Sequence, residues 1–168
     1  MDSETRLVVF TLATHRYAIE LERIQRVVRV VAVTPLPRAP ANVLGIIDFG
    51  GTVLPVINLR ERFNLQARSI RLSDHLIIAS TGRRIVALLV DEATGVIKIS
   101  PEEIAPGDGI LPRLEFIDGA VKLDDGLILI QDLDRLLSLE EEALIDQALS
   151  EQAAHNTATD SAKVVPQS

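Results

Sequence analysis

A series of short apolar segments, repeated once along the chain, constrains the fold more than any other feature of the sequence. Residues 7–19 hold two such segments joined by a polar turn, and residues 76–87 hold a similar pair. Residues 53–59 and 127–133 form a second matching pair. Segments of about four to eight residues that are rich in Val, Ile and Leu and end at turn residues are typical of β-strands. The repeat therefore predicts two similar halves built from short strands.

We expect these two halves to be closed barrels. Gly50-Gly51 lies between the strand-like segments 44–49 and 52–58, and paired glycines readily supply the positive φ of a tight hairpin turn. In the strand after this turn, at least Val56 is expected in the core. Each half holds about five short segments and no long helix. Closing a small sheet removes its exposed edges. The sequence thus predicts an all-β fold of two five-stranded barrels that share a hydrophobic core.

The end of the chain has a different pattern. Ser138, followed three residues later by Glu141, forms a capping box that marks the start of a helix. Apolar residues then recur at helical spacing: Leu144, Ile145, Ala148 and Leu149. We expect an amphipathic helix over residues 139–152. Residues 153–168 are mostly small and polar without an apolar period, which predicts a disordered tail.

Composition and charge exclude several classes of function. The chain of 168 residues has a net charge of −7 and only 3% aromatic residues, so a basic face with stacking platforms for nucleic acid is not expected. The apolar stretches are far shorter than the roughly 20 residues needed to cross a bilayer. The acidic start lacks a signal-peptide pattern. We therefore expect no nucleic-acid partner, no membrane insertion and a cytoplasmic location.

The sequence contains no recognisable catalytic or metal-binding pattern. Three histidines are scattered along it: His15, His75 and His155. Asp91 and Glu92 are adjacent on a predicted strand, so their side chains are expected on opposite faces. Asp124-Asp125-Gly126 is a common turn and lacks the further oxygen ligands of a calcium site. Four arginines are expected on a solvated surface: Arg60, Arg62, Arg68 and Arg71. We predict that the protein is not an enzyme and uses no cofactor and no metal.

Longer motifs in both halves resemble one known family. Residues 45–60 follow the pattern Gly-x-x-x-x-x-Gly-x-x-x-Pro-Val-x-x-Leu-Arg, which fixes residue types over a long window. Further matching segments span residues 7–12, 17–24, 35–37, 85–91, 100–104 and 127–133. In these motifs the chain resembles the CheW family over roughly residues 5–150.

The resemblance implies a fold, a function and partners. The fold would be two tandem five-stranded barrels of the SH3-like type within residues 1–138, with exchanged terminal strands and barrels at about 20–72 and 73–137. The function would be that of a non-enzymatic adaptor. It would couple the tips of chemoreceptors (methyl-accepting chemotaxis proteins) to a CheA-type histidine kinase and alternate in rings with the kinase's CheW-like regulatory domain.

The resemblance also implies a receptor-binding groove near the junction of the barrels. Receptor tips are helical hairpins, and an apolar groove would suit one apolar helix face. The expected groove residues are Ile24, Val28, Val86 and Leu88. The alternative is that all four belong to the core, and strand alternation predicts that about half of them do. The remaining predicted partner-binding residues are Arg26, Gly45, Asp48, Gly50 and Gly51.

Two of these positions depart from the family pattern. Family members usually carry Asn-Leu-Arg-Gly where residues 48–51 stand, so Gly50 replaces an arginine. The family often has Glu at the position of Arg26, which is expected on the same strand face as Ile24. One explanation is neutral drift on a tolerant surface. The other, which we favour, is a different partner set, as in a surface-sensing, pilus or biofilm signalling array.

Two further function classes serve as alternatives. A tandem SH3- or OB-like nucleic-acid-binding module would need a basic, aromatic face, which the pI near 4.9 opposes. A small hydrolase would need titratable groups that converge in a pocket, whereas the candidates here are scattered along the sequence.

Overall fold

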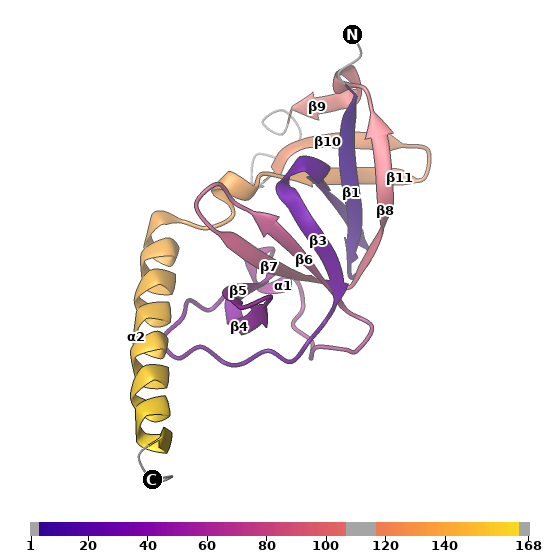
Figure 1. Ribbon diagram of the computed structural model, residues 1–168. Coiled ribbons are helices and arrows are strands. Elements are labelled where there is room, and N and C mark those ends of the chain that lie inside the picture. Colours follow the sequence, from indigo (N-terminus) through magenta and orange to yellow (C-terminus); the bar gives the residue numbers. More distant parts are fainter. Residues whose placement is uncertain (1–3, 107–116, 165–168) are drawn as a thin grey trace.

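The computed structural model describes residues 4–106 and 117–164, which form two sheets and few helices (Figure 1). The strands are β1 (Thr5–Leu12), β2 (His15–Glu20), β3 (Ile24–Arg29), β4 (Val43–Phe49), β5 (Thr52–Asn58), β6 (His75–Ser80), β7 (Ile85–Val90), β8 (Glu92–Ile99), β9 (Ile104–Pro106), β10 (Ile117–Leu123) and β11 (Gly126–Gln131). The helices are α1 (Leu59–Arg62) and α2 (Leu139–Val164), with 3-10 turns η1 (Leu21–Arg23), η2 (Pro101–Glu103) and η4 (Leu133–Arg135). The predicted all-β fold of two barrels is confirmed, and one of the two sheets has six strands where five were expected.

The first sheet, here called the five-stranded barrel, has the strand order β3-β6-β7-β5-β4 and uses residues 24–90. The chain after β3 pairs with β4, because the backbones of Thr34 and Ile46 exchange hydrogen bonds of 2.9 and 2.7 Å. This closure needs a glycine in β4. A Cβ on Gly45 would lie 2.1 Å from the Thr34 carbonyl oxygen, which no side chain tolerates.

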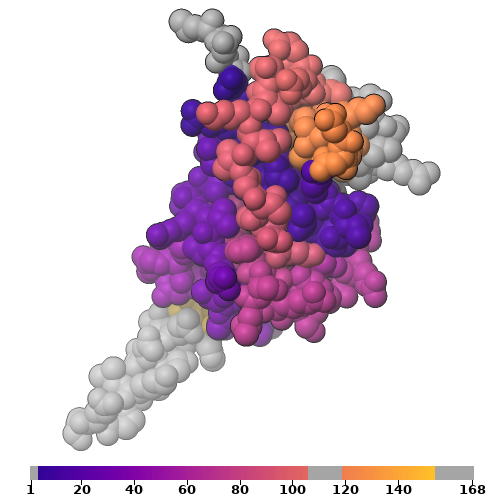
Figure 2. Space-filling model, turned by 90° about the vertical axis from the view of Figure 1, so that its right-hand side faces the viewer, coloured from indigo at the N-terminus to yellow at the C-terminus, as the bar shows by residue number. Residues whose placement is uncertain are grey.

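The second sheet, here called the six-stranded barrel, has the order β8-β1-β2-β11-β10-β9. It combines the N-terminal hairpin with strands from the second half of the chain. Figure 2 shows this mixing, with indigo, salmon and orange atoms gathered in one half of the molecule and purple and magenta atoms in the other. The short β9 pairs with β10. This pairing is equivalent to that of Thr34 with Ile46 of β4 in the five-stranded barrel. Here too a glycine allows the approach, since a Cβ on Gly119 would lie 2.9 Å from the Ala105 carbonyl oxygen.

The expected boundary between the barrels, at residues 72 and 73, is wrong. The hairpin β6–β7 belongs to the five-stranded barrel, which therefore ends at Val90, and β1–β2 belongs to the other barrel. In each barrel, the hairpin joins the sheet by a parallel pair: β7 lies along β5, and β2 lies along β11. Parallel partners are joined by long connections, so closeness in sequence does not reveal them.

The internal repeat is visible in this topology. The hairpins β1–β2 and β6–β7 occupy equivalent places, as do β11 and β5. Each of these last two strands runs directly into a helical turn with the same cap. The Asn58 side chain accepts a hydrogen bond from the Arg60 N–H, and Asp132 accepts one from the Asp134 N–H. The offset of 74 residues between the caps matches the offset between the segments 53–59 and 127–133.

Both barrels contribute to one shared core, as expected from the sequence. The Tyr17 ring from β2 stacks on Phe10 and on Phe63, with ring centroids 5.8 and 5.0 Å apart. Phe63 caps α1 at the end of β5, so this aromatic stack joins the two barrels. Smaller apolar clusters fill the inside of each barrel. Val56 is fully buried in one of them, which confirms its predicted core position.

Helix α2 packs along the five-stranded barrel and continues beyond it (Figure 1). The predicted capping box is present, because Ser138 and Glu141 each donate a backbone N–H to the other's side chain at 2.8 and 3.1 Å. Ile145 and Ala148 are buried in the shared core. The helix does not end near Gln152 as expected. It continues to Val164 because neither Gly nor Pro interrupts residues 139–164. Residues 165–168 of the expected tail lie outside the described residues.

Ion pairs hold this helix on the barrel surface. Arg84 follows the β6–β7 turn, and its Nε donates to Glu142 at 2.6 Å while its guanidinium also reaches Asp146. Arg62 pairs with Glu141 at 3.3 Å. Because the Glu142 and Arg84 side chains are largely buried, these contacts fix where α2 lies. In the part of the chain that the structure describes, no helix is long and apolar enough to cross a bilayer.

Candidate partner-binding surface

Strand β3 carries three of the predicted partner-binding residues. Among the described residues, its only strand partner along Ile24–Arg29 is β6, so its other edge is open. The register shifts between Ile24, which lies opposite Ala79, and Arg26, which lies opposite Ile78. Ala79 and Ile78 are neighbours in β6, so their side chains point to opposite faces of the sheet. Their partners Ile24 and Arg26 therefore also point to opposite faces. The expectation that these two side chains share a face is therefore wrong, and a β-bulge at Gln25 is the reason.

The four expected groove residues have different environments. Val86 and Leu88 are fully buried in the shared core, so they cannot line a groove on this chain. Ile24 is half-buried and packs against that same core. Val28 is half-buried on the other face of β3, against the inner cluster of the five-stranded barrel. Of the expected groove, only Ile24 and Val28 have accessible surface.

The predicted hairpin turn lies at the far end of β4 and β5. Gly50 and Gly51 are exposed with φ of +60° and +88°, so both occupy the left-handed region that favours glycine. The Asp48 carboxylate accepts a hydrogen bond of 2.9 Å from the Gly51 N–H and braces the turn. A Cβ added at Gly50 would meet nothing within 4 Å. Gly45, by contrast, is buried and serves the barrel closure, so a direct partner contact is not available to it.

A network of ion pairs joins the two barrels. Asp91 ends the connection from β7 to β8, and its carboxylate accepts hydrogen bonds from Arg60 at 2.6 Å and from Arg68 at 2.7 Å. It also accepts the Ala13 N–H of the β1–β2 turn at 2.8 Å. Arg68 bridges onward to the buried Asp74 at 2.6 Å. Arg60 and Arg68 therefore stabilise the junction of the barrels through these ion pairs. The expectation that these two side chains lie on a solvated surface is wrong.

The environment of Asp91 controls its pKa. Burial opposes ionisation of the carboxyl group. The hydrogen bonds from Arg60 and the Ala13 N–H, together with the positive charges of Arg68 and Arg60, outweigh that burial and lower the pKa of Asp91 below its ordinary value. Asp91 is thus held as a carboxylate and is fully engaged by its partners. It has no free lone pair directed at a substrate, which argues against a role as a general base.

The remaining titratable candidates do not converge. His15 begins β2, and His75 begins β6, where its Nδ1 accepts a hydrogen bond of 3.3 Å from the Ala93 N–H. The side chain of His155 lies outside the described residues. Within residues 4–106 and 117–153, no three histidine, aspartate or glutamate side chains gather as metal ligands would. Asp125 pairs with Arg16 at 2.9 Å at the tip of the β10–β11 hairpin.

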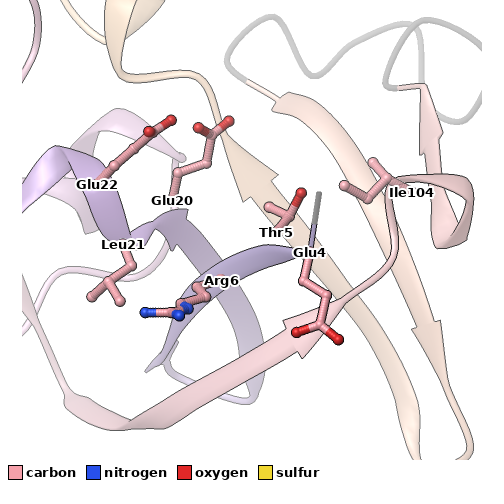
Figure 3. A pocket seen from close by; sticks show the side chains of 7 residues that line it. All are labelled: Glu4, Thr5, Arg6, Glu20, Leu21, Glu22 and Ile104. Atoms are coloured by element: carbon pink, nitrogen blue, oxygen red, sulfur yellow. The ribbon is translucent and has the colours of Figure 1, made fainter. Parts of the chain in front are cut away.

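An open cleft of about 530 Å³ lies where the start of β1 meets η1 and β9. Its lining residues are Glu4, Thr5, Arg6, Glu20, Leu21, Glu22 and Ile104. Figure 3 shows the carboxylates of Glu20 and Glu22 pointing in the same direction, away from Arg6 and Glu4. The cleft is dominated by charged side chains and is open to solvent. Sequence reasoning missed it because its walls come from segments that are distant in the chain.

Comparisons with known proteins agree with this architecture. The family model of the CheW-like domain matches residues 6–141. Chemotaxis protein CheW of Bacillus subtilis is 31% identical over 148 residues, which cover 85% of this chain and 94% of that protein. Chemotaxis protein CheW of Klebsiella aerogenes is 29% identical over 141 residues, which cover 83% of this chain and 85% of that protein.

A solved structure gives the same result in three dimensions. The crystal structure of the scaffolding protein TtCheW from Thermoanaerobacter tengcongensis superposes with a TM-score of 0.76 and 30% identity. The match covers 84% of this chain and 96% of that chain, so it includes both barrels. On the family match, the identity to these relatives and the shared two-barrel fold, this chain belongs to the CheW-like domain family.

Proposed function

We propose that this protein is a cytoplasmic, non-enzymatic adaptor that couples chemoreceptor tips to a CheA-type histidine kinase. The observation that carries the proposal is the match of the CheW-like domain to residues 6–141, which takes in both barrels and the ion-paired junction between them. A chemotaxis adaptor needs no catalytic group. This agrees with an Asp91 that is fully engaged in ion pairs and with histidines that lie apart.

The receptor contact is proposed at the open edge of β3. Ile24 offers partly exposed apolar surface beside the shared core, and Arg26 is exposed on the opposite face of the strand. Val27 is 37% exposed and adds apolar area on the edge. An edge strand with apolar and charged side chains can pack against a helical hairpin. Val86 and Leu88 support this edge from the core and do not touch the receptor.

Arg26 and Gly50 are proposed to set which receptor and kinase are recognised. Both residues are exposed, and both differ in charge from the usual family pattern. Exposed charges at the rim of an interface act mainly on association rate and selectivity, with about 0–1 kcal/mol per pair. A partner set outside standard swimming chemotaxis, as in a surface-sensing, pilus or biofilm array, fits this change of charge.

The test is a binding measurement with purified partners. We expect the protein to bind the cytoplasmic tip fragment of its own receptor and the regulatory domain of its own kinase. The double variant with Arg26→Glu and Gly50→Arg should bind its own receptor tip more weakly and a standard chemotaxis tip more strongly, with a larger difference at low salt. Lys122→Glu, which changes charge on β10 of the other barrel, is the control. Unchanged affinities of the double variant would place both positions outside the interface, and absence of any binding by the parent would refute the adaptor function.

A further inference from the structure

The loop between α1 and β6 is irregular in its backbone but is held in place by polar contacts (Figure 1). Near its start, the Arg60 guanidinium donates a hydrogen bond of 2.9 Å to the Gln66 carbonyl oxygen. Near its end, Arg68 donates to both carboxylate oxygens of Asp74, at 3.0 and 2.6 Å. The same carboxylate accepts the Arg71 N–H at 2.8 Å, and the Arg71 carbonyl oxygen accepts the Asp74 N–H at 3.0 Å. Contacts within the chain therefore fix the backbone of this loop.

The side chain of Arg71 stays unpaired on this fixed loop. It is exposed, and among the described residues it has neither an ion pair nor a side-chain hydrogen bond. Arg60 and Arg68, by contrast, are engaged by the carboxylates of Asp91 and Asp74. In this network two guanidinium groups face two carboxylates, so the charge of Arg71 has no counterpart. Its planar group of N–H donors matches the geometry of a carboxylate and is available to an anionic group from outside.

An open cleft of about 430 Å³ lies beside Arg71. It is lined by two alanines and by Arg60, Gln66, Arg68, Arg71 and Asp91. The Gln66 side chain is exposed and has no hydrogen-bond partner in the described part of the chain, so its amide offers a second donor. The Asp91 carboxylate is already neutralised by its two arginines. The cleft therefore presents one uncompensated positive charge with an unused amide donor in the same wall.

The loop that carries this cleft is continuous with the proposed receptor edge. Val30, directly after β3, donates its N–H to the Asp74 carbonyl oxygen at 3.0 Å, and Asp74 in turn closes the turn that begins at Arg71. Leu72, the next residue of that turn, is 88% exposed and adds apolar surface beside the cationic side chain. A helical hairpin that packs against β3 can therefore extend onto the loop.

We propose that the cleft binds an acidic side chain of the chemoreceptor tip, an inference that rests on the proposed function. The carboxylate pairs with the Arg71 guanidinium and accepts a hydrogen bond from the Gln66 amide, and Leu72 packs beside it. One uncompensated cation matches one carboxylate. An anionic membrane or a nucleic acid presents many negative charges, and the net charge of −7 on the chain opposes both.

The test measures the affinity of two variants for the receptor tip fragment at low and high salt. Arg71→Glu should bind about fivefold more weakly at low salt and lose less at high salt, as for an exposed ion pair. Gln66→Leu removes a donor without changing charge and should bind about threefold more weakly at both salt concentrations. Both variants should keep the melting temperature of the parent, because neither side chain has a partner among the described residues. Lys122→Glu, on β10 of the other barrel, is the control and should bind like the parent.

The occupant of the cleft is identified by exchanging charges between the two proteins. Each aspartate and glutamate of the tip fragment is replaced in turn by lysine, and each receptor variant is measured against the parent and Arg71→Glu. One receptor variant should bind the parent weakly and regain most of the affinity with Arg71→Glu. The inference is overturned if Arg71→Glu binds the unaltered tip like the parent, if no receptor variant restores its binding, or if it loses affinity for the kinase regulatory domain instead. If the parent binds neither receptor nor kinase, the proposed function itself fails.

Discussion

Arg60 holds the carboxylate of Asp91 with a contact of 2.6 Å, and this pair ties the end of the five-stranded barrel to the start of β8 in the other. Both side chains are mostly buried, with 12% and 22% of their surface exposed. Asp91 also accepts the Ala13 N–H, so one carboxylate contacts both barrels. The relative placement of the barrels therefore depends on this residue as well as on the shared apolar core.

Replacement of Asp91 by asparagine should destabilise the protein. The variant keeps the shape but loses the charge that Arg60 and Arg68 face, and we expect a decrease of about 2–3 kcal/mol in the free energy of unfolding. Chemical denaturation followed by circular dichroism measures this. Glu92→Gln, at the next and exposed residue, should change stability by less than about 0.5 kcal/mol. Equal stability of the two variants would contradict the structural role of Asp91.

The same carboxylate predicts a dependence of stability on pH. The folded protein lowers the pKa of Asp91, so the native state favours the ionised form more than the unfolded chain does. This contribution is present above the ordinary aspartate pKa of about 4 and is lost as pH falls through the lowered value. The difference in unfolding free energy between the parent and Asp91→Asn should therefore be largest near neutral pH and shrink below about pH 4. A difference that stays constant from pH 7 to pH 3 would exclude this linkage.

Two valines of β5 provide a test of the strand register. Val56 is fully buried, whereas Val53 in the same strand is 50% exposed. Val56→Asp should cost several kcal/mol because it buries an unpaired charge, and Val53→Asp should cost less than about 1 kcal/mol. Melting temperatures of both variants give the comparison. Similar melting temperatures would mean that β5 is wrongly placed in its barrel.

The glycines of the β4–β5 hairpin should differ in tolerance. Gly50 has φ of +60° and open space around it, so Gly50→Arg should cost only about 1 kcal/mol. Gly51→Val should cost about 2 kcal/mol or more, because a β-branched residue is poorly suited to φ of +88°. Gly45→Ala should be worse than either, since its Cβ would overlap the Thr34 carbonyl oxygen. The order of unfolding free energies tests these assignments, and equal losses at Gly50 and Gly51 would refute the turn geometry.

Local features of the fold could be predicted from the sequence. The Gly50-Gly51 turn, the Ser138–Glu141 capping box and the buried Val56 each depend on residues close together in the chain. The repeat also predicted that the chain has two similar halves built from short strands, because equivalent segments have the same apolar pattern. Family motifs then supplied the type of barrel.

Features that depend on distant partners could not be predicted. The parallel pairing of β7 with β5 moved the barrel boundary to Val90, and no local pattern marks such a pair. The bulge at Gln25 reversed the face of Arg26, because alternation fails once an extra residue enters a strand. Asp91 did carry a signal: a carboxylate at the end of a buried strand needs a cationic partner. Its partners Arg60 and Arg68 lie 31 and 23 residues away, so only the fold identifies them.

The coupling of receptor to kinase is tested most directly by reconstitution. Kinase autophosphorylation is measured with purified receptor and CheA-type kinase from the same cells, with and without this protein, and before and after addition of a receptor ligand. We predict that receptor ligand changes the rate of phosphorylation only when the protein is present, and that the protein has no such effect on the kinase without receptor. An equal ligand response with and without the protein would contradict its role as the adaptor.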